Sequence, residues 1–255
     1  MFFIINHTTG DILAVRGSKT GSSKRRSLSG SEAARSGRRR KTIIVKSKGK
    51  GQSSTRWLQR QLNDPYVHAA QDLGYRSRSA FKLLELNDKF KFLNSGKRVV
   101  DLGAAPGGWS QVAAEKVGKN GCVVAVDIQC IEPLPNVISL NLDIYSDRTT
   151  DHILEAIKGP ADIVLSDMAS KATGHAPTDH LRVMALVEAA EEIASILLAP
   201  HGTFIAKVFK GGTEAKLLKK IKDSYANVKH AKPPASRSGS PEEYVIAMNF
   251  LKSKY

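Results

Sequence analysis

The chain has 255 residues, 41% of them hydrophobic, and its 39 Lys and Arg exceed its 24 Asp and Glu to give a net charge of +15. This length and apolar content suit one folded domain with an appendage or two small domains, and the charge is unusual for a metabolic enzyme. A polyanion such as RNA is the natural partner of so basic a chain, because each phosphate that is neutralised releases counterions. No stretch approaches the roughly 20 apolar residues needed to span a membrane, so no membrane partner is expected.

The excess charge lies in the first part of the chain. Residues 1–50 hold 13 Lys and Arg and two acidic residues, a net charge of +11, whereas 26 basic and 22 acidic residues leave +4 for residues 51–255. Residues 1–53 are rich in Gly, Ser, Lys and Arg, and such a composition buries too little apolar surface to offset chain entropy. We therefore expect a mostly disordered leader over residues 1–53 and a folded domain over residues 54–255. The leader could attract RNA, aid solubility or serve as an organelle transit peptide, and these alternatives stay open.

Helical and strand patterns alternate along the folded part. A helix is expected over residues 57–74, and Ser77 or Ser79 is expected to cap a second helix with an apolar stripe between Ala80 and Leu86. Short apolar runs predict strands over residues 98–102, 122–128, 137–142, 162–165, 203–209 and 243–250. Helical periodicity predicts further helices over residues 108–117, 149–157, 178–198 and 214–225. Because strands alternate with helices, the sequence predicts an α/β fold with a parallel, doubly wound sheet.

The most informative stretch is residues 99–109, which read VVDLGAAPGGW. It runs from a buried strand through a turn of small residues into a helix, and doubly wound folds bind nucleotides at such a turn. The GxGxxG fingerprint of dinucleotide-binding proteins is absent. The pattern DxGxxPGG instead resembles the first motif of methyltransferases that use S-adenosylmethionine. The cofactor-binding residues that this resemblance implies are Asp101, Gly103, Ala104, Pro106, Gly107, Gly108 and Trp109.

Two acidic residues downstream extend the expected cofactor site. Asp127 ends the second strand, about 20 residues after the loop, where a carboxylate can bond ribose hydroxyls. Asp143 follows the third strand and is placed to meet the adenine amino group. A tight turn without a ligand is the alternative, and a nucleotide-dependent dehydrogenase is disfavoured because the Pro-Gly-Gly-Trp segment does not suit it.

Four residues stand out as candidates for catalysis. Lys82 lies on the helix before the cofactor loop, on the side away from the apolar stripe, and Asp167 closes the fourth strand in the segment SDMA. Lys207 lies inside the apolar strand 203–209, where a lysine is rare without a function. Glu242 opens the last strand. Taken singly, Lys82 and Glu242 are also typical of a solvated surface, and Asp167 of a helix or turn cap.

The segments RWL, GYRSRSAFKL, DLGAAPGGWSQ, SDMA and AKVF together resemble the FtsJ-type ribose 2′-O-methyltransferases, and the resemblance covers about residues 54–250. It is strongest to the bacterial branch that modifies a uridine of 23S ribosomal RNA. The resemblance implies a Rossmann-like fold with a seven-stranded, mostly parallel sheet, S-adenosylmethionine as cofactor, and a catalytic set of Lys82, Asp167, Lys207 and Glu242. Asp167 counts with both the catalytic and the cofactor-binding residues. The chain departs from the family pattern at Ser170, where a proline is usual, and in its long basic leader.

The chemistry of ribose methylation agrees with this catalytic set. A ribose hydroxyl is a weak nucleophile near neutral pH, so it must lose its proton or be strongly hydrogen bonded as it attacks the sulfonium methyl in line. A neutral Lys207 could accept that proton, while Asp167 and Glu242 would orient the two amines. A mechanism in which the lysines only position the hydroxyl stays open.

The expected partner is large-subunit ribosomal RNA within a pre-ribosomal 50S particle, and the expected enzyme is a monomer. RNA phosphates are expected on the basic and aromatic residues Arg56, Trp57, Arg60, Arg76, Arg78, Lys210 and Arg237. The expected compartment is the bacterial cytoplasm, with the mitochondrion as the alternative. Two rival functions stay open, namely 2′-O-methylation of tRNA or of a messenger cap, and an RNA-binding ribosome-assembly factor. Neither the cysteines nor the histidines have a ligand spacing, so no metal site is expected.

Overall fold

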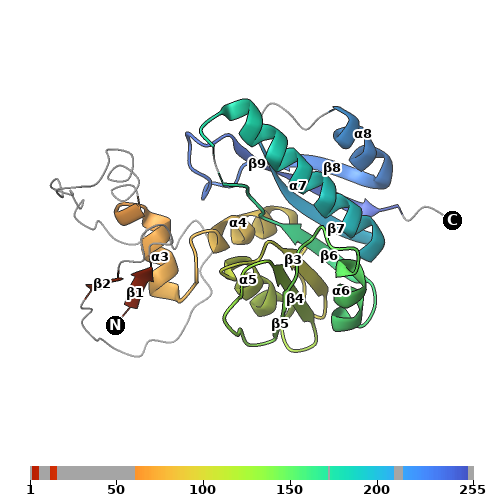
Figure 1. Cartoon of the computed structure of the whole chain (residues 1–255). Helices are drawn as coiled ribbons and strands as arrows, with labels where there is room; N and C mark the ends of the chain where they lie inside the picture. The colour runs from red at the N-terminus through yellow and green to blue at the C-terminus, as the bar shows by residue number, and fades with distance from the viewer. Residues whose placement is uncertain (1, 6–11, 16–60, 172, 210–214, 252–255) are drawn as a thin grey trace.

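A computed structural model describes residues 2–5, 12–15, 61–171, 173–209 and 215–251 (Figure 1). Seven strands form one sheet in the order β5-β4-β3-β6-β7-β9-β8. The five parallel strands are β3 (Arg98–Leu102), β4 (Cys122–Asp127), β5 (Val137–Asn141), β6 (Ala161–Ser166) and β7 (Leu198–Phe209). Two antiparallel strands, β9 (Glu242–Phe250) and β8 (Tyr225–Ala231), complete the sheet beyond β7. The Rossmann-like fold with a seven-stranded, mostly parallel sheet is thus confirmed.

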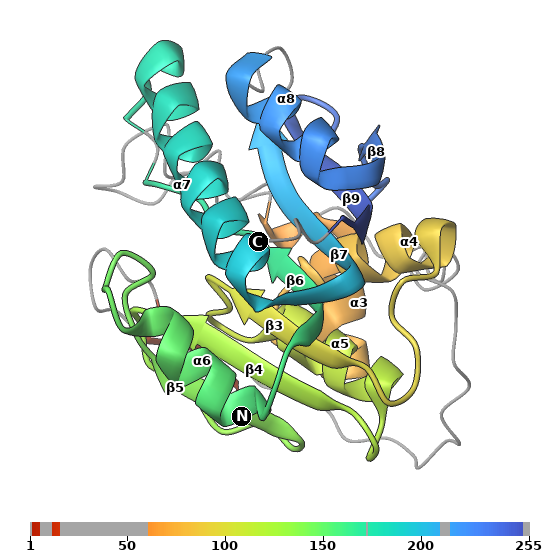
Figure 2. The same cartoon turned by 90° about the vertical axis from the view of Figure 1, so that its right-hand side faces the viewer.

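Helices cover both faces of the sheet (Figures 1 and 2). They are α3 (Pro65–Leu73), α4 (Ala80–Phe90), α5 (Gly108–Val117), α6 (Thr149–Ile157), α7 (Ala176–Leu197) and α8 (Ala215–Ser224). One apolar core joins the sheet to α6, α7 and α8, and a second core joins its other face to α3, α4 and α5. Among the described residues, no helix is long and apolar enough to cross a bilayer.

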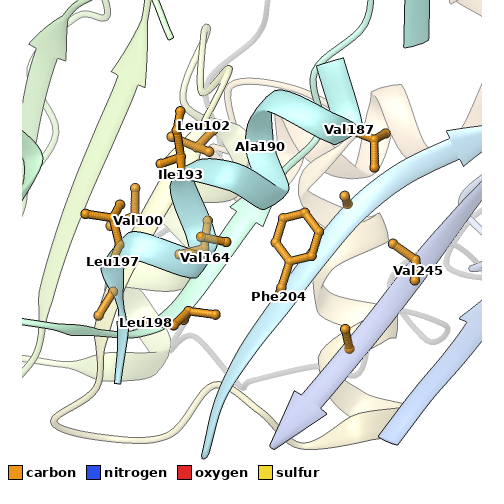
Figure 3. Close-up of a cluster of buried hydrophobic side chains, with 14 of the residues drawn as sticks. Val100, Leu102, Val164, Val187, Ala190, Ile193, Leu197, Leu198, Phe204 and Val245 are labelled. Atoms are coloured by element: carbon orange, nitrogen blue, oxygen red, sulfur yellow. The ribbon is translucent and has the colours of Figure 1, made fainter. Parts of the chain in front are cut away.

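The two cores follow from the alternation of side chains along each strand. On β3, Val100 and Leu102 point to the α6–α8 face, whereas Val99 points to the α3–α5 face. Figure 3 shows Val100 and Phe204 of the sheet packed against the α7 side chains, including Leu197. Each fully buried aliphatic side chain of this kind contributes about 1.5–3 kcal/mol relative to an exposed one. This packing fixes the strands whose carboxyl ends carry the site.

The helix expected over residues 57–74 is interrupted: residues 61–62 are helical, residues 63–64 are not, and residues 57–60 lie outside the described part. The α3 helix begins at Pro65, because the Asp64 side chain accepts a hydrogen bond from Tyr66 N at 3.0 Å and proline lacks the N–H that an earlier turn would need. Ser79 does occupy the N-cap position of α4, but it makes no side-chain capping bond. Its hydroxyl instead lies 2.6 Å from that of Ser77.

Three strand features differ from the sequence prediction. The strand predicted over residues 203–209 begins earlier, at Leu198, which pairs with Ala161 of β6. The edge strand β8 was not predicted, because it carries exposed polar residues such as Lys229 and His230 and shows no apolar run. Within the segment expected to be disordered, β1 (Phe2–Ile5) and β2 (Ile12–Val15) pair antiparallel. Apolar runs on both sides of a short glycine-containing link favour such a pair. The rest of the expected leader lies outside the described residues.

Candidate active site

The candidate catalytic residues converge at the edge of the sheet where the parallel strands end. Asp167 directly follows β6, and Lys207 lies near the end of β7. Because β9 runs antiparallel to β7, its first residue, Glu242, pairs with Phe209 at the same edge. Lys82 reaches this edge from α4. The structure therefore brings together four residues that lie up to 160 positions apart in the chain.

Lys207 and Asp167 form a buried ion pair. Lys207 Nζ donates to Asp167 Oδ1 at 2.9 Å and to the backbone carbonyl of Asp167 at 2.6 Å. The Lys207 side chain is only 7% exposed. Removing one partner of such a pair would leave an uncompensated buried charge, which is strongly unfavourable. The position of the amine is thus set by two bonds to a single residue.

A second ion pair joins α4 to β9. Lys82 Nζ lies 2.8 Å from both carboxylate oxygens of Glu242, and the hydroxyl of Ser236 donates to Glu242 Oε1 at 2.7 Å. Lys82 is 8% exposed, so the alternative interpretation of it as a residue of a solvated surface is wrong. Its ammonium also lies 5.9 Å from the centre of the Tyr244 ring, within range of a cation–π contact.

Tyr244 is a site residue that sequence reasoning missed. It is fully buried, and its hydroxyl donates to Asp167 Oδ1 at 2.7 Å. One sequence signal pointed toward it: Tyr244 lies two residues after Glu242, so a strand places both on the same side. The register that pairs Tyr244 with Lys207 is seen only in the structure. Burial, together with the charges of Asp167 and Glu242, raises the pKa of Tyr244 well above its usual value, so it stays a donor.

The electrostatics of the site keep Asp167 ionised. Burial by itself would raise the pKa of this carboxyl. The charges of Lys207 and Lys82, with the hydrogen bonds from Lys207 and Tyr244, outweigh burial and lower the Asp167 pKa below its usual value. Asp167 is therefore an anion at neutral pH and holds two donors in fixed directions.

The loop between β3 and α5 (the glycine loop, residues 103–108) packs closely against neighbouring parts of the protein. Gly103 has φ +70°, and a Cβ there would come within 2.2 Å of Met168 Cγ. The backbone amides of Gly103 and Ala104 donate to Val126 O at 2.8 and 3.1 Å, which fixes the loop on the neighbouring strand β4. A Cβ on Gly108 would come within 2.2 Å of Ser77 Oγ. The structure thus gives specific reasons for glycine at these positions.

Asp101 and Asp127 flank this loop. The Asp127 carboxylate accepts from Ala105 N at 2.9 Å and from Gln129 N at 2.8 Å, so it also holds the turn in place. Asp101 is buried, and Ser110 Oγ donates to its Oδ2 at 2.6 Å, whereas Oδ1 has no partner among the described residues. Burial raises the pKa of Asp101 to about 7, and the charges of Asp167 and Asp127 add to this effect. A cationic ligand beside Asp101 would offset that cost, and S-adenosylmethionine carries two positive groups, so these residues fit it.

The remaining expected cofactor residues divide into two groups. Asp143 is exposed beyond β5, and its carboxylate is held by Tyr145 N at 3.0 Å, so it is open to a ligand. Pro106 is also exposed, and Gly107 has φ +106° beside it. Trp109, in contrast, is 2% exposed, donates from Nε1 to Ser79 O at 2.9 Å, and packs 5.6 Å from the Tyr244 ring. Trp109 is therefore a core residue that anchors the loop to α4.

The three described arginines that were expected to bind RNA already have partners within the protein. Arg76 donates to the carbonyls of Pro106, Glu132 and Pro133 at 2.7–3.0 Å. Arg78 Nε lies 3.0 Å from Asp64 Oδ2, and Arg237 Nη2 lies 3.4 Å from the same oxygen. Arg56, Trp57, Arg60 and Lys210 lie outside the described residues. In the described part of the chain, no group of three or more His, Cys, Asp or Glu could hold a metal ion.

The sheet order, the glycine loop and the paired lysines and acids define a methyltransferase of the Rossmann-like class. The model of the FtsJ-like methyltransferase family matches residues 75–250, and the chain belongs to this family. It is 56% identical over 223 residues to the ribosomal RNA large subunit methyltransferase E of Paramagnetospirillum magneticum, covering 85% of this chain and 91% of that protein. The protein of the same name from Parvibaculum lavamentivorans is 48% identical over 241 residues, covering 91% of this chain and 95% of that protein.

A solved structure supports the same fold. The crystal structure of a ribosomal RNA methyltransferase from Plasmodium falciparum superposes with a TM-score of 0.62 at 32% identity. The superposition covers 69% of this chain and 99% of that one. The prediction of an FtsJ-type methyltransferase from the sequence motifs is thus confirmed.

Proposed function

We propose that this protein transfers the methyl group of S-adenosylmethionine to a ribose 2′-hydroxyl of large-subunit ribosomal RNA, at a uridine of the 23S molecule. The observation that carries the proposal is the convergence of two buried Lys–carboxylate pairs, Lys207–Asp167 and Lys82–Glu242, at the sheet edge beside the glycine loop. The relatives named as large-subunit ribosomal RNA methyltransferases support this substrate.

In this proposal, Lys207 receives the proton of the attacking hydroxyl. Asp167 takes two of the three positions around Nζ that are not bonded to carbon, which leaves one position for substrate. A neutral amine at that position would remove the ribose proton while the oxygen forms its bond to the methyl carbon. When bound, S-adenosylmethionine supplies a methyl on a positive sulfur, and the electron pair of the broken carbon–sulfur bond stays on that sulfur. Lys82, fixed by both oxygens of Glu242, orients the ribose from the other side.

The alternative role for Lys207 is to donate a hydrogen bond that positions the hydroxyl. If Lys207 is the base, it must be neutral to act, so turnover at saturating substrate would rise with pH as the lysine loses its proton. A positioning ammonium would give the opposite slope. The pH dependence of kcat therefore separates the two roles.

The decisive experiment for the function is to map 2′-O-methylation across the ribosomal RNA of cells that lack this protein. We expect one uridine of the 23S molecule to lose its methyl group, and the wild-type gene but not a Lys207→Ala version to restore it. If ribosomal RNA is unchanged and tRNA or a messenger cap loses methylation instead, the substrate assignment is wrong. A ribosome-assembly defect that both genes rescue equally would favour the RNA-binding assembly factor.

We further propose that the enzyme acts as a monomer on a pre-ribosomal 50S particle in the bacterial cytoplasm, with residues 54–255 as the catalytic domain. The bacterial origin of the two relatives supports this compartment. The mitochondrial alternative rests on the Arg- and Ser-rich leader over residues 1–53, of which only 2–5 and 12–15 are described.

A further inference from the structure

We infer that Glu85 is a positioning residue that sets the geometry of the catalytic Lys82–Glu242 pair by fixing the segment before β9. Glu85 and Lys82 lie three positions apart on α4, so they share one side of the helix. The inference rests on the proposed function, because it concerns how the proposed catalytic pair is held.

The first contact of Glu85 is with the backbone of the β8–β9 connection. Glu85 Oε2 accepts a hydrogen bond from Ala235 N at 2.6 Å, and its Oε1 accepts from the hydroxyl of Tyr66 at 2.9 Å. Arg78 donates to the carbonyl of the same Ala235, which is fully buried. Glu85 of α4 and Arg78, in the connection between α3 and α4, thus hold the backbone N–H and the carbonyl of Ala235.

The next residue, Ser236, transmits this placement to the catalytic pair. Ser236 is 6% exposed and its hydroxyl donates to Glu242 Oε1 at 2.7 Å. Its backbone N–H donates to Pro233 O at 2.8 Å, so the segment is a closed turn and its hydroxyl has a defined direction. Glu242 in turn holds Lys82 with both oxygens at 2.8 Å. This series of contacts therefore begins at Glu85 and ends at Lys82, and both residues lie on α4.

Among the residues that the structure describes, Glu85 makes no contact that would give it a reacting role. Its carboxylate oxygens are both used by Ala235 and Tyr66, and burial raises its pKa above the usual value even though the bond from Ala235 N opposes this effect. Its effect on catalysis would therefore pass through Ser236 and Glu242. A misplacement of about 1 Å in a catalytic group can cost roughly 100-fold in rate.

The test uses the full-length enzyme with S-adenosylmethionine and large-subunit particles from cells that lack the protein. Glu85→Ala should lower kcat by roughly tenfold while the cofactor Kd stays within about twofold of wild type. Glu85→Gln should keep most activity, because its oxygen can accept from Ala235 N and its amide can donate to the Tyr66 hydroxyl. Asp88→Ala is the matched control, since Asp88 is an exposed acid on the same helix, and it should leave kcat unchanged.

A second comparison separates positioning from a general loss of structure. In a Glu242→Gln background, Glu85→Ala should lower the residual kcat by less than about twofold, because the group through which it acts is already altered. A further tenfold loss there, or wild-type kcat for Glu85→Ala itself, would overturn the inference. If Glu85→Ala fails to fold, Glu85→Asp makes the same test, because the shorter acid withdraws from Ala235 N.

Amide hydrogen exchange gives a readout that does not need activity. The Ala235 amide should exchange slowly in wild type and at least tenfold faster in Glu85→Ala, with no such change in Asp88→Ala. A wild-type enzyme that methylates no RNA would contradict the proposed function while this exchange result still tests the contact. Unchanged exchange at Ala235 would contradict the inference alone.

Discussion

Tyr244 donates its hydroxyl hydrogen to Asp167 Oδ1 at 2.7 Å. The same oxygen accepts from Lys207 at 2.9 Å, and Lys207 and Tyr244 are paired residues on the neighbouring strands β7 and β9. The sheet register therefore places two donors on one carboxylate oxygen. This arrangement makes the orientation of Asp167 depend on strand pairing.

We predict that Tyr244→Phe lowers kcat by roughly tenfold and the free energy of unfolding by about 1.5–3 kcal/mol, because a hydrogen bond to a buried charge is lost. Tyr225→Phe is the matched control. Tyr225 is also buried, but its hydroxyl has no hydrogen-bond partner among the described residues, so its removal should cost no stability. For each variant, thermal unfolding measures the stability and steady-state kinetics measures kcat. Equal effects of the two substitutions would contradict the role assigned to the Tyr244 hydroxyl.

Lys207→Ala should lower methyl transfer by about 10²–10⁴-fold, the usual contribution of a positioned acid–base group. The cofactor Kd should stay nearly the same, because Lys207 bonds to Asp167 and not to the glycine loop. Single-turnover methylation and calorimetric titration measure the two quantities. Near-normal turnover would make Lys82 the next candidate for the base.

Asp101 should make the fold less stable as the pH rises. Its pKa is about 7 in the folded protein, above the value of about 3.9 for an unfolded aspartate. A group whose folded pKa is raised stabilises the fold below the unfolded pKa, and this contribution is lost as the pH rises through about 7. Asp101→Asn should therefore unfold at a higher temperature than wild type at about pH 8, with little difference at about pH 4. Asp143→Asn, at an exposed site, is the control and should show no such rise in unfolding temperature at about pH 8. An equal rise there would contradict the attribution of the effect to the buried Asp101 carboxyl.

Arg76→Ala should weaken cofactor binding by roughly tenfold while the affinity for RNA changes less. Arg76 joins the carbonyl of Pro106 in the glycine loop to those of Glu132 and Pro133 in the connection after β4, so its loss frees both sides of the cofactor site. Arg182→Ala, an exposed arginine on α7, serves as the control for charge alone. Calorimetry and filter binding measure the two affinities. A larger loss in RNA affinity than in cofactor affinity would support the prediction from the sequence that Arg76 binds RNA.

Deletion of residues 1–50 should raise the KM for ribosomal particles at low salt and leave kcat similar. These residues carry a net charge of +11, so they should add non-specific attraction that salt screens steeply. Binding of the truncated protein should also depend less on salt. A truncated protein with the RNA affinity and salt dependence of the full chain would favour the transit peptide instead.

Much of the fold could be predicted because apolar periodicity decides where buried strands lie. The strand Arg98–Leu102 and the helices Gly108–Val117 and Thr149–Ile157 have the boundaries that the sequence predicts. The edge strand Tyr225–Ala231 has no such signal, because it pairs with β9 alone and most of its middle residues are exposed.

Some residues of the candidate site could likewise be predicted from the sequence, and others could not. Lys207 was visible because a lysine interrupts an apolar strand, and its pairing with Asp167 is now seen in the structure. The roles of Tyr244 and Ser236 depend on strand register and on a closed turn, and neither can be read from local composition. Trp109 belongs to a recognisable motif, yet its indole is buried in the core, because motif membership does not determine the direction of a side chain.

The pair between Lys82 and Glu242 also has a consequence for synthesis of the chain. Lys82 comes from the second described helix of the domain and Glu242 from its last strand, 160 residues later. Domains begin to fold from the N-terminal side as the chain emerges at about 5–20 residues per second. The cofactor loop and the first strands can therefore form while the catalytic pair is still incomplete. Under the proposed mechanism, a chain that stops before Glu242 lacks one member of this pair, so fragments released from the ribosome before that residue would be inactive.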